Sequence, residues 1–249
     1  MGLYISGTAI GGMGGRLIAG VLVDFISWQS ATYIIGFLNL IIACLFYFLL
    51  PKSQHFKPYP FRFSRFKDAF EQNLKDSKLR ILFAQGFILM GCLVTVFNYI
   101  SYHLLEAPFH LSQAWIGVIS IAYLAGIYSS PKAAQWGFKY GRDKVLPMML
   151  MTMMIGLWFT LLPSLWSILI GLIIFAFSFF AAHSTASSWV SVQAVQYRAV
   201  ASSLYLFCYY IGSSLLGSFG GLVWEQFGWI GINLSVSVVL VIGLVSALY

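Results

Sequence analysis

The sequence predicts an all-α membrane protein that crosses the bilayer several times, and three observations support this fold class. Hydrophobic residues make up 60% of the 249 residues and charged residues only 8%, against roughly 25% charged in a soluble domain. The apolar residues form eight long stretches separated by polar breaks. Lys and Arg gather in every second break, as they do in the cytoplasmic loops of membrane proteins.

The first two stretches predict spans near residues 3–23 and 31–50. They must be helical because the hydrocarbon core offers no water to satisfy backbone groups, and about 20 helical residues cross it. The first span is rich in glycine and holds Arg16, the one basic residue inside an apolar stretch. The second is almost bare of polar side chains, so it can face lipid.

A basic segment at residues 52–80 separates these two spans from the rest of the chain. Within it, apolar residues recur at steps of three and four between Arg and Lys, at Phe63, Phe66, Phe70 and Leu74. This spacing is typical of a basic amphipathic helix lying in the cytoplasmic interface. The alternative is a solvated linker that only sets the topology.

Six further stretches are each long enough to cross the bilayer. They predict spans near 81–105, 115–131, 146–162, 165–189, 201–224 and 230–249. All prolines are expected at span ends or in loops, Pro131 and Pro147 included, where a missing N–H donor is harmless. Since basic breaks lie in the cytoplasm, the alternation also predicts that both termini are cytoplasmic.

Two segments of the chain resemble each other. Residues 3–28 align without a gap with residues 204–229 and share glycines, an acidic outer end and a tryptophan. Such a repeat is the signature of a duplicated transporter. The second copy would hold six spans, of which the first four have no counterpart here. We therefore expect this chain to represent the last two-thirds of a twelve-span protein.

The segments GTAIGGMGGRLIAG, QGFILMGCLVTVFNYISYHLLEAPFHLSQAWIG and ASSLYLFCYYIGSSLLGSFGGLVW resemble the major facilitator superfamily. Within it they look like the drug:proton antiporter branch and a bacterial inner-membrane, arabinose-efflux-like group. The resemblance implies a partial major facilitator fold, from the fifth to the twelfth helix. It divides the chain into the last two helices of the first bundle (1–51), a cytoplasmic linker (52–80) and a six-helix second bundle (81–249).

The family also carries a cytoplasmic loop motif, Gly-x-x-x-Asp-Arg-x-Gly-Arg. The resemblance places Lys139, Gly141 and Arg142 in the copy between the fourth and fifth spans of this chain. Phe138 stands at the Asp position and Ala134 at the leading Gly position. This departure weakens the charge-relay role that the family would imply for the loop.

Polar side chains at membrane depth usually face a bundle interior or a wet cavity. They are concentrated in spans 81–105, 165–189 and 201–224, which are therefore expected to line a cavity. The candidate pathway residues in these spans are Asn98, Tyr99, His183, Trp189 and Tyr209. His183 either carries protons or is a neutral histidine hydrogen-bonded inside the bundle. Asn98 and Tyr99 bind either a polar substrate or a neighbouring helix.

Arg16 is the sixth candidate pathway residue. Its charge near the middle of a span costs at least about 2.5–3.5 kcal/mol on insertion scales. A carboxylate, a carbonyl or a substrate anion must compensate. The alternatives to a pathway role are a structural pair with a group outside this chain and snorkelling toward Asp24 at the outer interface.

Small residues four apart let helices approach closely in lipid. The sequence holds three such stripes, namely Gly7, Gly11 and Gly15; Ala122, Gly126 and Ser130; and Ser213, Gly217 and Gly221. By the resemblance, the first two stripes lie on helices at the interface between the bundles, so these helices are expected to touch. The family partner of the third stripe is absent from this chain, so we expect that face to be exposed.

Together these features predict a secondary active transporter for proton-coupled efflux of a small, sugar-like or drug-like solute by alternating access. No Asp or Glu lies inside a predicted span, so the coupling group is His183 or an acid outside this chain. The alternative is a truncated, non-transporting fragment, or a half that needs a separate four-helix partner. Metal-ligand, P-loop and hydrolase motifs are missing from the sequence. We expect no enzymatic activity, cofactor, metal or nucleic-acid partner, and the oligomeric state stays open.

Overall fold

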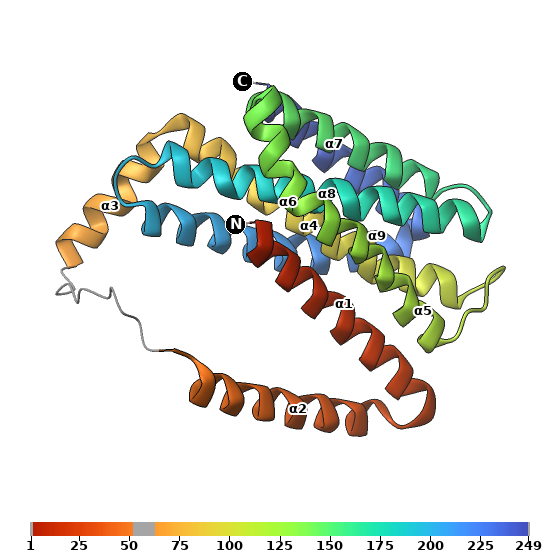
Figure 1. Cartoon of the computed structure of the whole chain (residues 1–249). Coiled ribbons are helices and arrows are strands. Elements are labelled where there is room, and N and C mark those ends of the chain that lie inside the picture. Colours follow the sequence, from red (N-terminus) through yellow and green to blue (C-terminus); the bar gives the residue numbers. More distant parts are fainter. Residues whose placement is uncertain (1, 52–62, 249) are drawn as a thin grey trace.

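A computed structural model of the chain describes residues 2–51 and 63–248, and every regular element within them is helical (Figure 1). The helices are α1 (Gly2–Phe25), α2 (Trp28–Leu49), α3 (Phe63–Lys75), α4 (Ser77–Leu105), α5 (Gln113–Ile119), α6 (Tyr123–Tyr140), α7 (Arg142–Phe159), α8 (Leu165–Gln193) and α9 (Arg198–Ala247), with a 3₁₀ turn at Ser120–Ala122 between α5 and α6. The all-α fold predicted from the sequence is confirmed.

The predicted spans correspond to these helices. Six helices in the described part of the chain are long and apolar enough to cross a membrane, by length and composition. One of them, α9, contains two predicted spans, because Gly228 interrupts it with φ 56° and ψ −148°. A further predicted span corresponds to α7, which falls short of these criteria because its first turn carries Arg142, Asp143 and Lys144.

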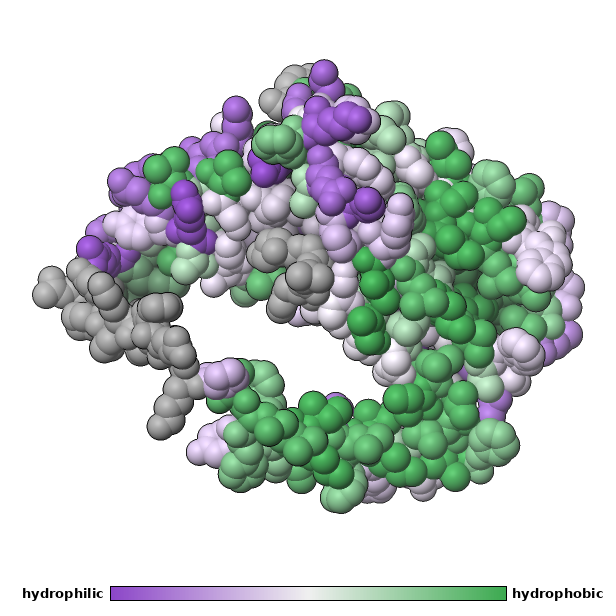
Figure 2. Space-filling model, viewed as in Figure 1, coloured by the Kyte–Doolittle hydropathy of each residue, from purple (hydrophilic) through white to green (hydrophobic). Residues whose placement is uncertain are grey.

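The helices from α4 onward pack together, and α1 lies across one side of that group against α5 and α6 (Figure 1). The next helix, α2, turns back and packs chiefly against α1. Figure 2 shows open space between the strongly apolar α2 and the remaining helices. Ala31 is the only buried residue of α2, so nearly its whole surface is available to lipid or to further helices.

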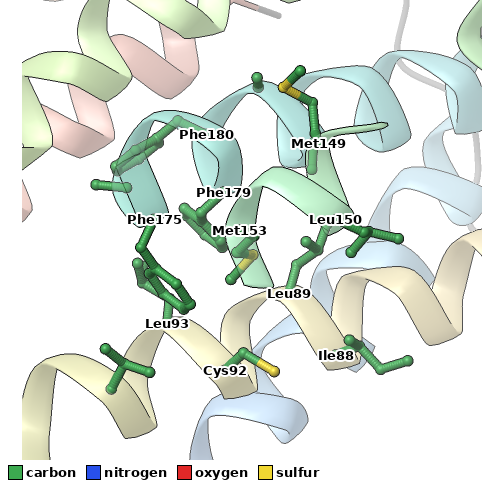
Figure 3. Packing of buried hydrophobic residues seen from close by; sticks show 14 of the residues in the cluster. Ile88, Leu89, Cys92, Leu93, Met149, Leu150, Met153, Phe175, Phe179 and Phe180 are labelled. Carbon is green, nitrogen blue, oxygen red and sulfur yellow. The ribbon is translucent and has the colours of Figure 1, made fainter. Parts of the chain in front are cut away.

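Part of the apolar core lies where α4, α7 and α8 meet (Figure 3). Leu89 from α4, Leu150 and Met153 from α7 and Phe179 from α8 are completely buried there. The backbones of α7 and α8 come close at Gly156 and Gly171. A Cβ added to Gly156 would lie 2.8 Å from the Gly171 oxygen, and one added to Gly171 would lie 2.6 Å from the Gly156 oxygen. Small residues at such contacts are the usual means of close helix packing in membranes.

Pro131 and Pro147 correct one prediction, because they lie inside α6 and α7 rather than at span ends. A proline inside a helix leaves the carbonyl four residues earlier without its usual partner. For Pro131 that carbonyl belongs to Ile127, and the Ser6 hydroxyl of α1 donates to it at 3.2 Å. A neighbouring helix thus satisfies the freed group, as is common within membranes.

The fourth predicted span, 115–131, is also longer and less regular than predicted. It begins at Gln113, passes through the 3₁₀ turn and continues to Tyr140. The Ser120 hydroxyl donates to the Gly117 carbonyl at 2.6 Å, competing for a helix acceptor at the start of the turn. Lys132 and Lys139, predicted in a loop, therefore lie within α6. Lys139 is in its last turn, where a cation is favourable.

The amphipathic helix predicted in the linker is present as α3. Its small or polar side, Ala69 and Asn73, is buried, and α3 contacts α4 and α9. Its apolar residues stay largely exposed, with Phe63 at 72% and Leu74 at 37% of their accessible surface. This leaves an aromatic side for the membrane interface, and its location there stays a prediction. Residues 52–62 of the linker lie outside the described part of the chain.

Candidate functional site

The structure brings two of the predicted pathway residues together, Arg16 of α1 and Asn98 of α4. Arg16 Nη2 donates to Asn98 Oδ1 at 2.9 Å, and Arg16 Nη1 donates to the Phe97 carbonyl oxygen at 3.3 Å. The guanidinium carbon lies 5.9 Å from the centroid of the Phe97 ring. Neutral acceptors thus hold the arginine against α4.

Arg16 does not reach toward Asp24. The Asp24 carboxylate instead accepts a hydrogen bond from the Ala114 backbone N–H at 3.0 Å, at the start of α5. The only ion pair found within the described segments joins Lys67 and Glu71 on α3. Arg16 therefore does not pair with Asp24, and the described part of the chain gives Arg16 no carboxylate partner.

A cavity of about 280 Å³ lies beside the Arg16 side chain, between α1, α4 and α5. Its apolar wall includes Val23, Phe97 and Ile116, and Gln113 and Ser101 contribute polar groups. The helices can approach here because Gly20 of α1 faces α5. A Cβ added to Gly20 would lie 2.6 Å from the Gln113 oxygen and 3.0 Å from the Gly117 Cα.

The predicted contact between α1 and the α5–α6 segment is therefore present, but it uses another face of α1. A Cβ added to Gly7, Gly11 or Gly15 would meet nothing within 4 Å, so the predicted stripe faces open space. The contact runs instead through Gly20 and through Gly12, where an added Cβ would lie 3.3 Å from the Tyr123 ring. The α1 sequence carries glycine on several faces, and their spacing alone selected the wrong one.

The other two stripes also differ from prediction. Ala122 is buried, and an added Cβ at Gly126 would overlap the Phe180 ring, so this stripe packs on α8 rather than on α1. The face with Gly217 and Gly221, predicted to be exposed, is covered by α4. Tyr99 Oη donates to the Gly217 carbonyl oxygen at 2.8 Å and would lie 3.3 Å from a Cβ on Gly221.

Tyr99 therefore points away from Arg16, although it follows Asn98 directly in the chain. Besides its hydrogen bond to α9, its ring stacks on Trp224 with centroids 6.1 Å apart. Successive helix residues differ by about 100° in direction. Asn98 thus contacts α1, while Tyr99 contacts α9. Of the two interpretations of Tyr99, the contact with a neighbouring helix is present.

His183 and Tyr209 form a second group, inside the packed helices. His183 Nδ1 is 2.8 Å from the Tyr205 hydroxyl, and its ring lies 4.6 Å from the Tyr209 ring, centroid to centroid. On the other side it stacks on Phe179. His183 is buried and does not line the Arg16 cavity, so a proton-carrying role would require this group to open.

The polar residues that follow His183 in α8 correct the prediction of a wet cavity along this helix. Ser184 donates to the Ser130 carbonyl at 2.9 Å, and Thr185 donates to the Ala181 carbonyl at 2.9 Å. Both are buried, so they bind backbone within the helical bundle. Farther along α8, Trp189 lines a separate cavity of about 390 Å³ with Lys78 and Asp143.

Two tyrosines that the sequence did not single out complete these groups. Tyr205 is the hydrogen-bond partner of His183. Tyr123 packs edge-on against Phe97 with centroids 4.7 Å apart and also interacts with the Arg16 side chain. Tyrosines are common in membrane proteins as interfacial anchors, so their residue type alone did not separate these two from the rest.

The residues assigned to the loop motif, Lys139, Gly141 and Arg142, lie around a tight turn between α6 and α7. Gly141 forms it with φ 91°, a conformation that favours glycine. Arg142 begins α7, and the Lys139 ammonium lies 5.0 Å from the centroid of the neighbouring Tyr140 ring. The charge relay of this motif stays untested.

The chain is similar to known proteins that are named as transporters. A family model described as Major Facilitator Superfamily matches residues 1–217. The inner membrane transport protein YnfM of Escherichia coli is 48% identical over 244 residues, covering 98% of this chain and 58% of that protein. An uncharacterized transporter of Buchnera aphidicola subsp. Schizaphis graminum is 46% identical over 248 residues, and the uncharacterized MFS-type transporter YybF of Bacillus subtilis 41% over 244. The chain spans about 60% of the length of these relatives.

Proposed function

The chain belongs to the major facilitator superfamily, and we propose that it forms the main part of a secondary transporter that exports a small solute in exchange for protons. In this family type, two helical bundles rock around a central site that opens alternately to each side. We assign residues 1–51 to the end of the first bundle, 52–80 to the linker and 81–249 to the second bundle.

The observation that carries this proposal is the cavity beside Arg16. It lies at the junction between α1 and two helices of the second bundle, α4 and α5. Rocking of the bundles would change the distance between these helices, and with it the access to Arg16. Polar and charged groups inside membrane segments are rare and usually mark substrate or ion pathways. Arg16 and Asn98 are the residues that we assign to the solute.

Proton coupling is the second part of the proposal. Among the acidic residues of the described spans, Asp24 lies at the end of α1 and Glu225 lies three residues before the break of α9 at Gly228. We propose that His183 carries the proton, or that an acid elsewhere in the complete protein does. Breaking the His183–Tyr205 hydrogen bond would be part of that step.

We also propose that the protein lies in a bacterial inner membrane with both termini in the cytoplasm. Supporting this are the relatives, one of which is named an inner membrane protein, and the basic residues of α3 and of the α6–α7 turn. Lys and Arg are enriched in cytoplasmic segments. Export toward the outside would then run from the basic end to the acidic end of the helices.

The test uses inverted bacterial membrane vesicles that carry the chain fused to the part of the Escherichia coli relative outside the match. A pH-sensitive dye reports proton movement when candidate solutes are added to energised vesicles. We expect some solutes to release protons, and Arg16→Ala to abolish the response at unchanged membrane abundance. A response that survives this substitution would contradict the role of Arg16. Loss of abundance would show a structural role instead.

A second candidate is favoured by α2, whose surface is almost entirely exposed. In this alternative, the chain alone does not transport, and a separate four-helix partner must cover α1 and α2. The test compares vesicles that carry the unfused chain alone with vesicles that carry it together with the four-helix part as a separate polypeptide. Proton movement with the two separate chains but not with the chain alone would support the alternative, and proton movement by the chain alone would contradict it.

A further inference from the structure

We propose that the cavity beside Arg16 binds a small organic carboxylate, so that the exported solute is an organic acid anion. This inference rests on the proposed export function and names the substrate class for its central residue. Three features of the cavity carry it, namely an arginine charge with no carboxylate beside it in the described part of the chain, hydroxyl groups whose protons are already engaged, and an apolar wall of limited size.

The first feature is the positive charge of the Arg16 guanidinium. A guanidinium stays protonated in proteins and presents five N–H donors. Two Arg16 nitrogens donate to the Phe97 carbonyl and the Asn98 amide oxygen, and the Tyr123 side chain also interacts with Arg16. None of these three groups is a carboxylate. Within residues 2–51 and 63–248, no carboxylate lies within 4.0 Å of the Arg16 nitrogens. A positive charge at membrane depth favours an anion as its partner, and a carboxylate matches the guanidinium fork in two parallel hydrogen bonds.

The polar groups of the wall point to the same ligand. Ser101 donates its hydroxyl proton to the Phe97 carbonyl at 3.0 Å, and Ser120 donates to the Gly117 carbonyl at 2.6 Å. Their protons are therefore engaged with backbone acceptors. The donors left for a ligand come from the Arg16 guanidinium and the Gln113 amide, which suits an acceptor-only group such as a carboxylate.

The volume of the cavity and its apolar wall indicate what the ligand carries besides its carboxylate. Its volume of about 280 Å³ lies just below the range of roughly 300–1,000 Å³ typical of small-molecule sites. Val23, Phe97, Ile116 and Ile119 provide an apolar surface beside the charge. An inorganic anion would leave this surface uncovered, whereas an acid with one small apolar group would cover it.

The experiment measures binding of radiolabelled benzoate to the purified 249-residue chain in detergent, by scintillation proximity at fixed chloride concentration. We expect saturable binding that unlabelled benzoate displaces and that benzamide, of equal size but neutral, displaces at least tenfold less well. Arg16→Gln should weaken binding at least tenfold. Arg198→Gln, which removes the arginine at the start of α9 whose Nε donates to the Ala194 carbonyl, should leave it unchanged.

Several results would overturn the proposal, namely no saturable binding, equal displacement by benzamide, or unaltered binding by a monodisperse Arg16→Gln chain. Displacement by phosphate as effective as by benzoate would show a site for inorganic anions and would also overturn it. The comparison of benzoate with benzamide uses the wild-type chain, so it tests the proposal even if Arg16→Gln fails to fold. Proton-coupled export of neutral solutes without benzoate binding would refute this inference and leave the proposed function standing. Benzoate binding without proton movement would support the carboxylate site and contradict the proposed proton-coupled export.

Discussion

At the residue scale, the α1–α5 contact depends on Gly20, whose hydrogen faces the Gln113 carbonyl. We expect Gly20→Ala to destabilise the chain by about 1–3 kcal/mol, the usual effect of overpacking, because the new Cβ would lie 2.6 Å from that oxygen. The matched control is Gly11→Ala on the same helix, where a Cβ meets nothing within 4 Å. Alanine is the better helix former, so the control should be neutral or stabilising. Thermal unfolding of the purified variants measures both, and equal effects would contradict the contact.

A second residue-scale prediction concerns Asp76, which caps the N-terminus of α4. Its carboxylate accepts hydrogen bonds from the Lys78 and Leu79 N–H groups at 2.8 and 3.2 Å and from Gln193 Nε2 of α8 at 2.9 Å. Burial raises the pKa of Asp76, but the Gln193 bond, the two backbone bonds and the charge of Lys78 outweigh it, so the pKa lies below its ordinary value.

A carboxyl whose pKa is lowered by folding stabilises the native state above its unfolded pKa of about 3.9, and that stabilisation is lost as the pH falls through the folded-state pKa. We expect wild type to be more stable than Asp76→Asn at pH 7, and the difference to shrink as the pH falls through the folded-state pKa of Asp76. Asp76→Ala should be less stable by about 1 kcal/mol even in acid, since it also removes the cap. Melting temperatures from pH 3 to pH 7 test this, and a constant gap between wild type and Asp76→Asn would refute it.

At the element scale, the proline in α6 is tolerated because α1 supplies a hydrogen bond to the carbonyl that it frees. Ser6→Ala should cost about 0.6 kcal/mol, the average for side-chain hydrogen bonds in a membrane protein. In a Pro131→Ala background, the new N–H of residue 131 can bond to Ile127, so the same substitution should cost less. A double-mutant cycle on unfolding free energies measures the coupling. Strict additivity would show that Ser6 does not compensate for the proline.

The second element-scale prediction concerns the break in α9. Gly228 adopts φ 56° and ψ −148°, in a region that is nearly exclusive to glycine and costs other residues about 1–3 kcal/mol. Space is not the constraint, since nothing lies within 4 Å of an added Cβ. We expect Gly228→Ala to lower the melting temperature and Gly36→Ala, within helix α2 and equally unobstructed, to leave it unchanged or raise it. Equal behaviour of the two variants would show that α9 does not need the break.

At the scale of the whole molecule, the sequence located the helices well because lipid makes hydropathy decisive. It did not locate the contacts between them. Ser6, which bonds the Ile127 carbonyl freed by Pro131, lies 121 residues from Ile127 in the chain, so no local pattern predicts this contact. The polarity of Arg16 and Asn98 is visible in the sequence, but their hydrogen bond joins two residues that are 82 apart in the chain. His183 stands out in the sequence as a titratable group, yet the residues that bond and pack against it, Tyr205 and Tyr209, lie on the next helix, α9.

The sidedness of the whole chain follows from the positions of its charges and is open to direct measurement. The basic α3 should face the cytoplasm and the α9 break the outside, because the translocation of short basic segments is disfavoured. We replace Cys44 and Cys208 by alanine, keep the buried Cys92, and introduce Lys75→Cys or Gln226→Cys, both at exposed positions. A membrane-impermeant maleimide added to spheroplasts should label position 226 at once and position 75 only after permeabilisation. Labelling of both positions from one side would contradict the topology, and with it the export direction that we assign to the Arg16 cavity.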